Sequence, residues 1–154
     1  MINDDEKWMN LALQEASKAE AKGEIPVGAV LIIDGKLIAK AHNQSISKND
    51  ATAHAEIELL RKAGKAQKNY RVINSTIYST LEPCAMCFGA MVHARVKRIV
   101  FGASDPKTGV CGSCIDMPNL YFFNHQIDSE GGILEEDCRI KLQKFFKGRR
   151  YQLN

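Results

Sequence analysis

The sequence lacks any long hydrophobic run, and no apolar stretch approaches the roughly 20 residues that a helix needs to cross a bilayer. It also lacks the basic and apolar segments of a signal peptide, because residues 1–6 are acidic instead. We therefore expect a cytoplasmic protein that has no membrane partner. The five cysteines are an odd number, which argues against a fully paired secreted framework and favours thiolates that bind a metal.

Nothing in the sequence resembles an interdomain linker, an internal repeat or a low-complexity segment. Its 154 residues are the length of one domain, so we expect a single domain over residues 1–154. The apolar fraction of 45% and the charged fraction of 25% exclude collagenous and disordered classes. A net charge of +3 gives no sign of nucleic-acid binding by itself.

Positive charge is concentrated at the C-terminal end. The last fourteen residues contain no acid and five cations, namely Lys141, Lys144, Lys147, Arg149 and Arg150. Two interpretations stay open at this point. The cations either complement the dipole of a solvated helix end or contact phosphate groups.

Hydrophobic periodicity predicts an α/β protein. Helices are predicted over residues 4–22, 54–63, 85–94 and 135–148. Gly23 and Gly64 are expected to end the first two helices. Strands are predicted over residues 26–33, 36–41, 76–80, 98–102 and 125–128, with an irregular segment over 103–124. A hairpin turn at Asp34-Gly35, followed by alternating helices and strands, predicts a mixed sheet covered by helices on both faces.

Two short segments carry the candidate chemistry: His54-Ala55-Glu56, and Pro83-Cys84-Ala85-Met86-Cys87. The Cys-x-x-Cys spacing lets both sulfurs reach one ion, because the second cysteine lies one helical turn after the first. Alone, this pair fits a redox dithiol or half of a structural zinc site equally well. A histidine adds a third ligand, and three protein ligands leave a position for water, as in catalytic zinc sites.

The start of each helix constrains where this site lies. Residues two apart on a helix point about 200° away from each other, so His54 and Glu56 share a site only beyond the helix N-terminus. Cys84 likewise stands at the start of the next predicted helix. The sequence therefore predicts a zinc ion between two helix N-termini, whose dipoles help to keep the thiols ionised.

These segments resemble the signature of the cytidine-deaminase-like superfamily, which is His-x-Glu followed by Pro-Cys-x-x-Cys. More narrowly, the chain is similar over nearly its whole length to bacterial tRNA-specific adenosine deaminases. That narrower similarity depends on two softer segments, Asp105-Pro106-Lys107-Thr108-Gly109 and Phe145-Phe146. The fold that the resemblance implies is a three-layer α/β/α sandwich with a central mixed five-stranded sheet.

The resemblance implies one zinc ion per subunit, with His54, Cys84 and Cys87 as ligands and water as the fourth. Glu56 would then carry protons from water to N1 of adenine and to the departing ammonia, giving inosine. The implied substrate is the wobble adenosine of an arginine tRNA, presented in the anticodon stem-loop, whose bases splay outward cheaply. Members of the family are homodimers, which implies the same here.

Contacts to the substrate are also implied by the resemblance. The backbone N–H of Ala55 would steady the reacting edge of the base, and Asn43 would read the base. Asp105 and Lys107 would touch the nucleotides that flank the target. The terminal helix beside the anticodon loop would contribute Phe146, Arg149 and Arg150.

The residues alone leave other interpretations of some of these positions. A loop asparagine such as Asn43 often bonds its own backbone, and Phe145-Phe146 also fits a hydrophobic core. Many members of the family have proline where this chain has Ser45 and Ala51, so we expect looser loops beside the pocket.

Other functions and other sites stay open from the sequence. A guanine or other free-base deaminase would share the zinc core, but it needs a closing lid and not a basic C-terminal end. A non-catalytic, zinc-stabilised RNA-binding module would tend to lose the glutamate that this chain has at position 56. The second Cys-x-x-Cys, Cys111 to Cys114, has no evident histidine partner and is expected to be unremarkable, and His125 is expected to make a structural hydrogen bond.

Overall fold

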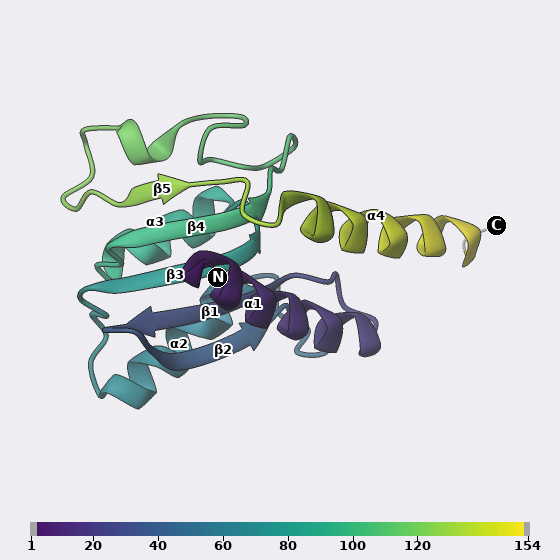
Figure 1. Cartoon of the computed structure of the whole chain (residues 1–154), viewed down its shortest axis with the longest axis horizontal. Helices are drawn as coiled ribbons and strands as arrows, with labels where there is room; N and C mark the ends of the chain where they lie inside the picture. The colour runs from purple at the N-terminus through teal and green to yellow at the C-terminus, as the bar shows by residue number, and fades with distance from the viewer. Residues whose placement is uncertain (1–2, 153–154) are drawn as a thin grey trace.

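A five-stranded mixed sheet forms the middle layer of the protein (Figure 1). The computed structural model describes the backbone of residues 3–152 and the side chains of residues 3–149. The strands are β1 (Gly28–Ile33), β2 (Lys36–His42), β3 (Ser75–Leu81), β4 (Arg98–Ala103) and β5 (Asp128–Glu130), in the order β2-β1-β3-β4-β5. β1 is antiparallel to β2 and β3, whereas β3, β4 and β5 are parallel. The predicted mixed five-stranded sheet is therefore confirmed.

Helices cover both faces of the sheet, which confirms the predicted three layers (Figure 1). They are α1 (Asp4–Ala21), α2 (Ala55–Gln67), α3 (Ala85–His93) and α4 (Glu135–Gln152). α1 and the first turns of α4 lie on one face, and α2 and α3 lie on the other. Among the described residues, no helix combines the length and the apolar character that a membrane crossing requires.

Alternation along the strands explains why the sheet has two buried faces. Successive side chains point to opposite faces, so each central strand contributes to both layers of the core. The cluster on the α2–α3 side includes Ala29, Leu31, Ile77, Ile99, Leu59 and Phe88. The cluster on the α1 side includes Val30, Ile32, Tyr78, Val100, Met9 and Cys138. The continuous apolar run predicted as a doubly covered strand is β1.

Three of the predicted elements have a boundary that differs from the structure by three residues or more. α2 does not end at Gly64 but continues to Gln67, and Lys68, with φ of 53°, takes the left-handed conformation that closes the helix. The last strand is not 125–128 but Asp128–Glu130, because His125 lies in the preceding loop and is hydrogen-bonded through Nε2 to the Val96 carbonyl at 2.6 Å. This bond confirms the structural role expected of His125. α4 runs past residue 148 to Gln152.

α4 extends beyond the edge of the sheet (Figure 1), and its distal part is hydrogen-bonded to the turn after α1 through Arg149. Its first part is held by Cys138, which is buried against β4. Farther along, Leu142 packs against the α2–α3 cluster, whereas Phe145 is only half-buried and Ile140 and Phe146 are exposed. The core interpretation of Phe145-Phe146 is therefore wrong for this chain.

Candidate active site

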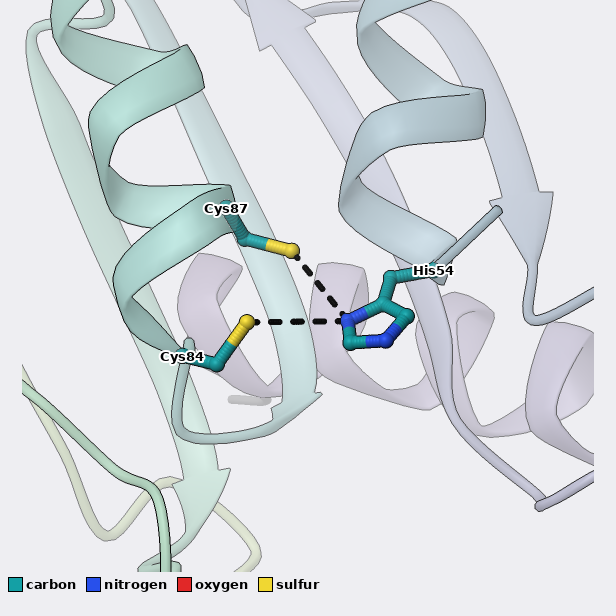
Figure 2. A group of neighbouring side chains, drawn as sticks. All are labelled: His54, Cys84 and Cys87. Carbon is teal, nitrogen blue, oxygen red and sulfur yellow. Dashed lines mark hydrogen bonds between the residues drawn. The ribbon is translucent and has the colours of Figure 1, made fainter. Parts of the chain in front are cut away.

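His54 and Cys84 each occupy the N-cap position of a helix, His54 before α2 and Cys84 before α3. An N-cap side chain usually bonds a backbone N–H of the first turn, but neither residue makes such a bond. Their side chains are therefore free to point at each other across the gap between the helices. Figure 2 shows the sulfurs of Cys84 and of Cys87, the third residue of α3, directed at Nδ1 of His54.

The three side chains form a compact donor set (Figure 2). His54 Nδ1 lies 3.6 Å from the Cys84 sulfur and 3.5 Å from the Cys87 sulfur. Ligands at the usual zinc distances are separated by about 3.5 Å when they occupy corners of a tetrahedron. One imidazole and two thiolates are also the donor types that zinc prefers. The residues present therefore fit a zinc ion that has three protein ligands.

No other group of three potential ligands lies close together within the part of the chain that the structure describes. Cys111 lies in an isolated bridge with Asp116, and the Cys114 thiol bonds the Pro106 carbonyl at 3.2 Å. The second Cys-x-x-Cys is therefore outside the metal cluster, as the sequence predicted.

Hydrogen bonds within the cluster shift the acidities of its members, and they favour the thiolate at Cys84. The hydrogen bond from Cys87 lowers the pKa of Cys84 to about 4, and His54 adds to this shift. The same bond raises the pKa of Cys87, since the proton is held between the two sulfurs. The hydrogen bond with Cys84 raises the pKa of His54. A bound cation would take the place of these shared protons.

Glu56 is the second residue of α2 and is buried, with 4% of its surface exposed. Burial raises its pKa to about 7, and the negative charge of Cys84 adds to the shift. A carboxyl group with a pKa near neutrality both accepts and donates protons readily. His54 and Glu56 line the same cleft, as the helix-start argument required.

A cleft of about 1340 Å³ opens in front of this cluster. Its lining includes these residues named from the sequence: Asn43, His54, Ala55, Glu56, Cys84, Asp105, Lys107, Phe146 and Arg149. Cys87 is fully buried behind the cleft wall. The side chain of Arg150 lies outside the described residues. The tertiary structure thus brings together segments that are as much as a hundred residues apart in the sequence.

Asn43 makes the local hydrogen bonds of a loop asparagine, and its side chain also lines the cleft. Its side-chain oxygen accepts hydrogen bonds from the Ser45 hydroxyl at 2.9 Å and from the Ser45 N–H at 3.4 Å. Its side-chain NH₂ has no acceptor among the described residues, although the side chain lines the cleft. The loop therefore orients the amide and leaves a donor for a bound base.

The backbone N–H of Ala55 is the first of α2. It has no hydrogen-bond acceptor among the described residues, as expected at a helix N-terminus. Because Ala55 lines the cleft between His54 and Glu56, this N–H is placed to donate to a ligand beside the metal cluster.

Asp105 shapes the loop that follows β4. Its carboxylate accepts hydrogen bonds from the N–H of Lys107 at 3.0 Å and from the Thr108 hydroxyl at 2.8 Å. The carboxylate is thus engaged within the loop, whereas the Lys107 side chain is exposed at the cleft. Of the two residues, Lys107 is the better placed to touch a bound ligand directly.

The far wall of the cleft belongs to α4. Phe146 is 44% exposed there, and its ring packs edge-on against Phe145 with centroids 5.5 Å apart. The guanidinium of Arg149 lies 4.9 Å from the centre of the Phe145 ring and donates to the Gly23 carbonyl at 2.9 Å. Arg149 therefore ties the distal part of α4 to the turn after α1.

Sequence reasoning missed two buried carboxylates that hold the loops on either side of the cleft. Glu24 is fully buried and Glu82 is 2% exposed, and both accept hydrogen bonds from loop N–H groups. The only signal in the sequence was the position of each acid, since Glu24 directly precedes an apolar segment and Glu82 directly follows a β-rich one.

Comparison with known proteins agrees with this geometry. Residues 2–103 match the family described as cytidine and deoxycytidylate deaminase zinc-binding region. A tRNA-specific adenosine deaminase of Haemophilus influenzae is 54% identical over 147 residues, which are 95% of this chain and 85% of that protein.

Solved structures give the same result. One, from a study of A-to-I editing by deaminases at the wobble position of transfer RNA, has a TM-score of 0.85 at 40% identity, covering 88% of this chain and 99% of that one. A guanine deaminase from Bacillus subtilis is less similar, with a TM-score of 0.62 at 36% identity over 68% of this chain and 66% of that one. The chain belongs to the cytidine and deoxycytidylate deaminase zinc-binding family and, within it, to the tRNA-specific adenosine deaminases.

Proposed function

We propose that this chain is a zinc-dependent deaminase that converts adenosine to inosine at the wobble position of a tRNA anticodon, with arginine tRNA as the expected substrate. The observation that carries the proposal is the shared cleft. The cluster of His54, Cys84 and Cys87 lies at its inner end beside Glu56, and the exposed aromatic and cationic residues of α4 form its outer wall.

The chemistry follows from the position of Glu56. Zinc held by His54, Cys84 and Cys87 supplies the Lewis acidity that makes water acidic enough to react near neutral pH. Glu56 takes a proton from that water and delivers it to N1 of adenine. It then passes a second proton to the amino group that leaves C6 as ammonia. Overall, adenosine and water give inosine and ammonia.

Recognition of the base falls to polar groups around this centre. The free NH₂ of Asn43 is a donor for a ring nitrogen or a ribose oxygen of the target nucleoside. The N–H of Ala55 donates at the reacting edge. Lys107 contributes a positive charge for a flanking phosphate, and Phe146 a face for stacking of a neighbouring base. Asp105 fixes the loop that carries Lys107.

The size and openness of the cleft favour an RNA substrate over a free base. Pockets for small molecules are typically about 300–1000 Å³ and enclose the ligand. The cleft here is about 1340 Å³, and residues of α4 line one of its walls. A guanine deaminase, the alternative for this zinc core, would need a lid that excludes water from a much smaller ligand.

We also propose that the chain acts as a homodimer. An open groove between α2 and α3, lined in part by Ile57, Leu60 and Ala90, lies on the side of the molecule away from the sheet. Tyr70, which also lines the groove, is 74% exposed. A second copy would cover these apolar side chains, and sedimentation equilibrium would show a dimer.

We place the protein in the cytoplasm. All five cysteines are free thiols in the structure, including the two zinc ligands, and thiols persist in a reducing compartment. The tRNA substrate would be found in the same compartment.

The decisive experiment uses an anticodon stem-loop that carries adenosine at the wobble position. Inosine should form at that position, and a matched stem-loop with adenosine moved to another loop position should stay unchanged. Free guanine should give no xanthine. Xanthine from guanine without inosine from the stem-loop would overturn the proposal in favour of the free-base alternative.

A further inference from the structure

Glu82 directly follows β3, two residues before the zinc-ligand position Cys84, and its carboxylate is buried without a cationic partner among the described residues. It accepts hydrogen bonds from the N–H of Asp105 at 3.0 Å, of Cys111 at 2.8 Å and of Ser113 at 3.2 Å. The Ser113 hydroxyl is a fourth donor. All four donors belong to residues 105–113, here called the cleft loop.

The cleft loop is built to receive this carboxylate. Gly109 lies directly against it, and a Cβ at position 109 would overlap with the carboxylate and with the Asp105 carbonyl. A further hydrogen bond holds the cleft loop to the residue after Glu82. The Val110 N–H donates to the Pro83 carbonyl at 3.0 Å. Hydrogen bonds to Glu82 and to Pro83 therefore hold the cleft loop next to Cys84, the following residue of the chain.

This arrangement distinguishes Glu82 from a group that moves protons. Four donors converge on its two oxygens, so it has little capacity left for a substrate or water. Removing the acceptor would leave buried N–H groups unpaired, which is costly. Glu82 therefore acts on the position of the cleft loop and not on the transfer of protons.

We propose that Glu82 is a positioning residue for the deamination reaction: it fixes the cleft loop relative to the metal ligands and so sets where the nucleotide beside the target base binds. The proposal depends on the function proposed above. Its physical basis is that Lys107 lies in the cleft loop, between the Asp105 and Cys111 anchor points, and lines the cleft.

Glu82→Gln is the most informative variant, because it should change the hydrogen bonds at the two ends of the cleft loop to different degrees. The Gln side chain can place its NH₂ toward Ser113, whose hydroxyl can rotate and accept this hydrogen bond. The Asp105 N–H then faces the same NH₂, which is a donor and cannot accept from it. Amide hydrogen exchange at Asp105 should become about tenfold faster, whereas exchange at Cys111 should change less. Gly109→Ala should loosen the same loop from its other side without altering the carboxylate.

Glu24 offers a matched control on the opposite side of the cleft. This fully buried carboxylate accepts hydrogen bonds from the N–H of Ile46 at 3.2 Å and of Ser47 at 2.6 Å. Glu24→Gln should speed exchange at residues 46–47 and leave the cleft loop unchanged. Zinc content should stay at one ion per chain in all three variants.

Kinetics on the wobble-adenosine stem-loop complete the test. In Glu82→Gln and Gly109→Ala, KM should rise about tenfold while kcat stays within about threefold, because binding and not chemistry is affected. Unchanged exchange at residues 105–113, exchange that rises across the whole chain, or a fall in kcat at unchanged KM would each overturn the proposal. If the wild-type protein left the stem-loop unmodified, the proposed function would be wrong, and the exchange data would still decide whether Glu82 anchors the loop.

Discussion

The sulfur of Cys138 in α4 lies directly over Gly102 in β4, so closely that a Cβ added to the glycine would overlap with it. Cys138 is 1% exposed and is the buried contact of α4 with the α1 side of the sheet. Together with the Arg149–Gly23 hydrogen bond farther along, this contact sets the direction of α4, whose residues Phe146 and Arg149 line the cleft.

Gly102→Ala should therefore destabilise the protein, because the added methyl group must push α4 away from the sheet. We expect the free energy of unfolding to fall by about 1–3 kcal/mol in urea denaturation. Gly89→Ala in α3 is the matched control, since nothing lies within 4 Å of the added Cβ there. That change should leave stability the same or raise it by up to about 1 kcal/mol. Equal effects of the two substitutions would show that the Gly102–Cys138 contact is not tight.

Glu56→Ala should abolish turnover while the fold and the zinc remain. The loss of a positioned proton carrier is expected to lower kcat by about 10²–10⁴-fold. Glu58→Gln, two residues along α2, provides the control. Glu58 is buried but pairs with Lys48 at 2.5 Å and with Arg61 at 2.8 Å, so its loss should lower stability and keep most of the turnover. Residual activity of Glu56→Ala near that of the wild type would exclude the assigned role.

Cys87→Ser should release the metal. With one thiolate fewer, zinc measured by atomic absorption should fall well below one ion per chain, and stem-loop deamination should fall with it. Cys114→Ser should keep both, because Cys114 lies outside the cluster. Full zinc occupancy in Cys87→Ser would mean that the metal is held elsewhere.

Lys107→Ala should weaken stem-loop binding through the loss of a phosphate contact. The affinity should fall several-fold, and the slope of log affinity against log salt should become shallower by about 0.7, the value for one cation on single-stranded nucleic acid. Lys36→Ala, at the exposed start of β2, removes the same charge far from the cleft and should leave the slope unchanged. Identical slopes in both variants would contradict a direct contact at Lys107.

Asp5 connects α1 to the sheet and makes stability depend on pH. It accepts hydrogen bonds from the Tyr78 hydroxyl at 2.7 Å and from the Arg98 guanidinium at 3.1 and 3.0 Å. The Arg98 hydrogen bond holds the pKa of Asp5 below its ordinary value of 3.8. The stabilisation is therefore complete above pH 3.8 and is lost as the pH falls through the lower pKa of the folded state.

Asp5→Asn should accordingly cost about 1 kcal/mol at neutral pH. The difference from the wild type in the free energy of unfolding should shrink as the pH is lowered below 3.8. Urea denaturation at a series of pH values measures both quantities. A difference that stayed constant through the acid range would show that the Asp5 carboxylate contributes no charge-dependent stability.

The metal cluster was predictable because it depends on local geometry. Cys84 and Cys87 are one turn apart, and His54 and Glu56 can face a common point only at a helix start. The strand that is buried on both faces was predictable for the same reason, since the continuous apolar run of β1 is visible in consecutive residues. β5 was misplaced because Asp128–Glu130 is short, polar and exposed, so no hydrophobic pattern marks it.

The sequence by itself thus determined which side chains could bind zinc and carry protons, because helical and strand periodicities are properties of neighbouring residues. Only the tertiary structure decided that Phe146 faces the cleft instead of the core, and that Glu24 and Glu82 hold the loops beside it. Burial of these carboxylates depends on backbone N–H groups that are more than twenty residues away in the chain. No local pattern encodes such a pairing, since it exists only once the sheet has assembled.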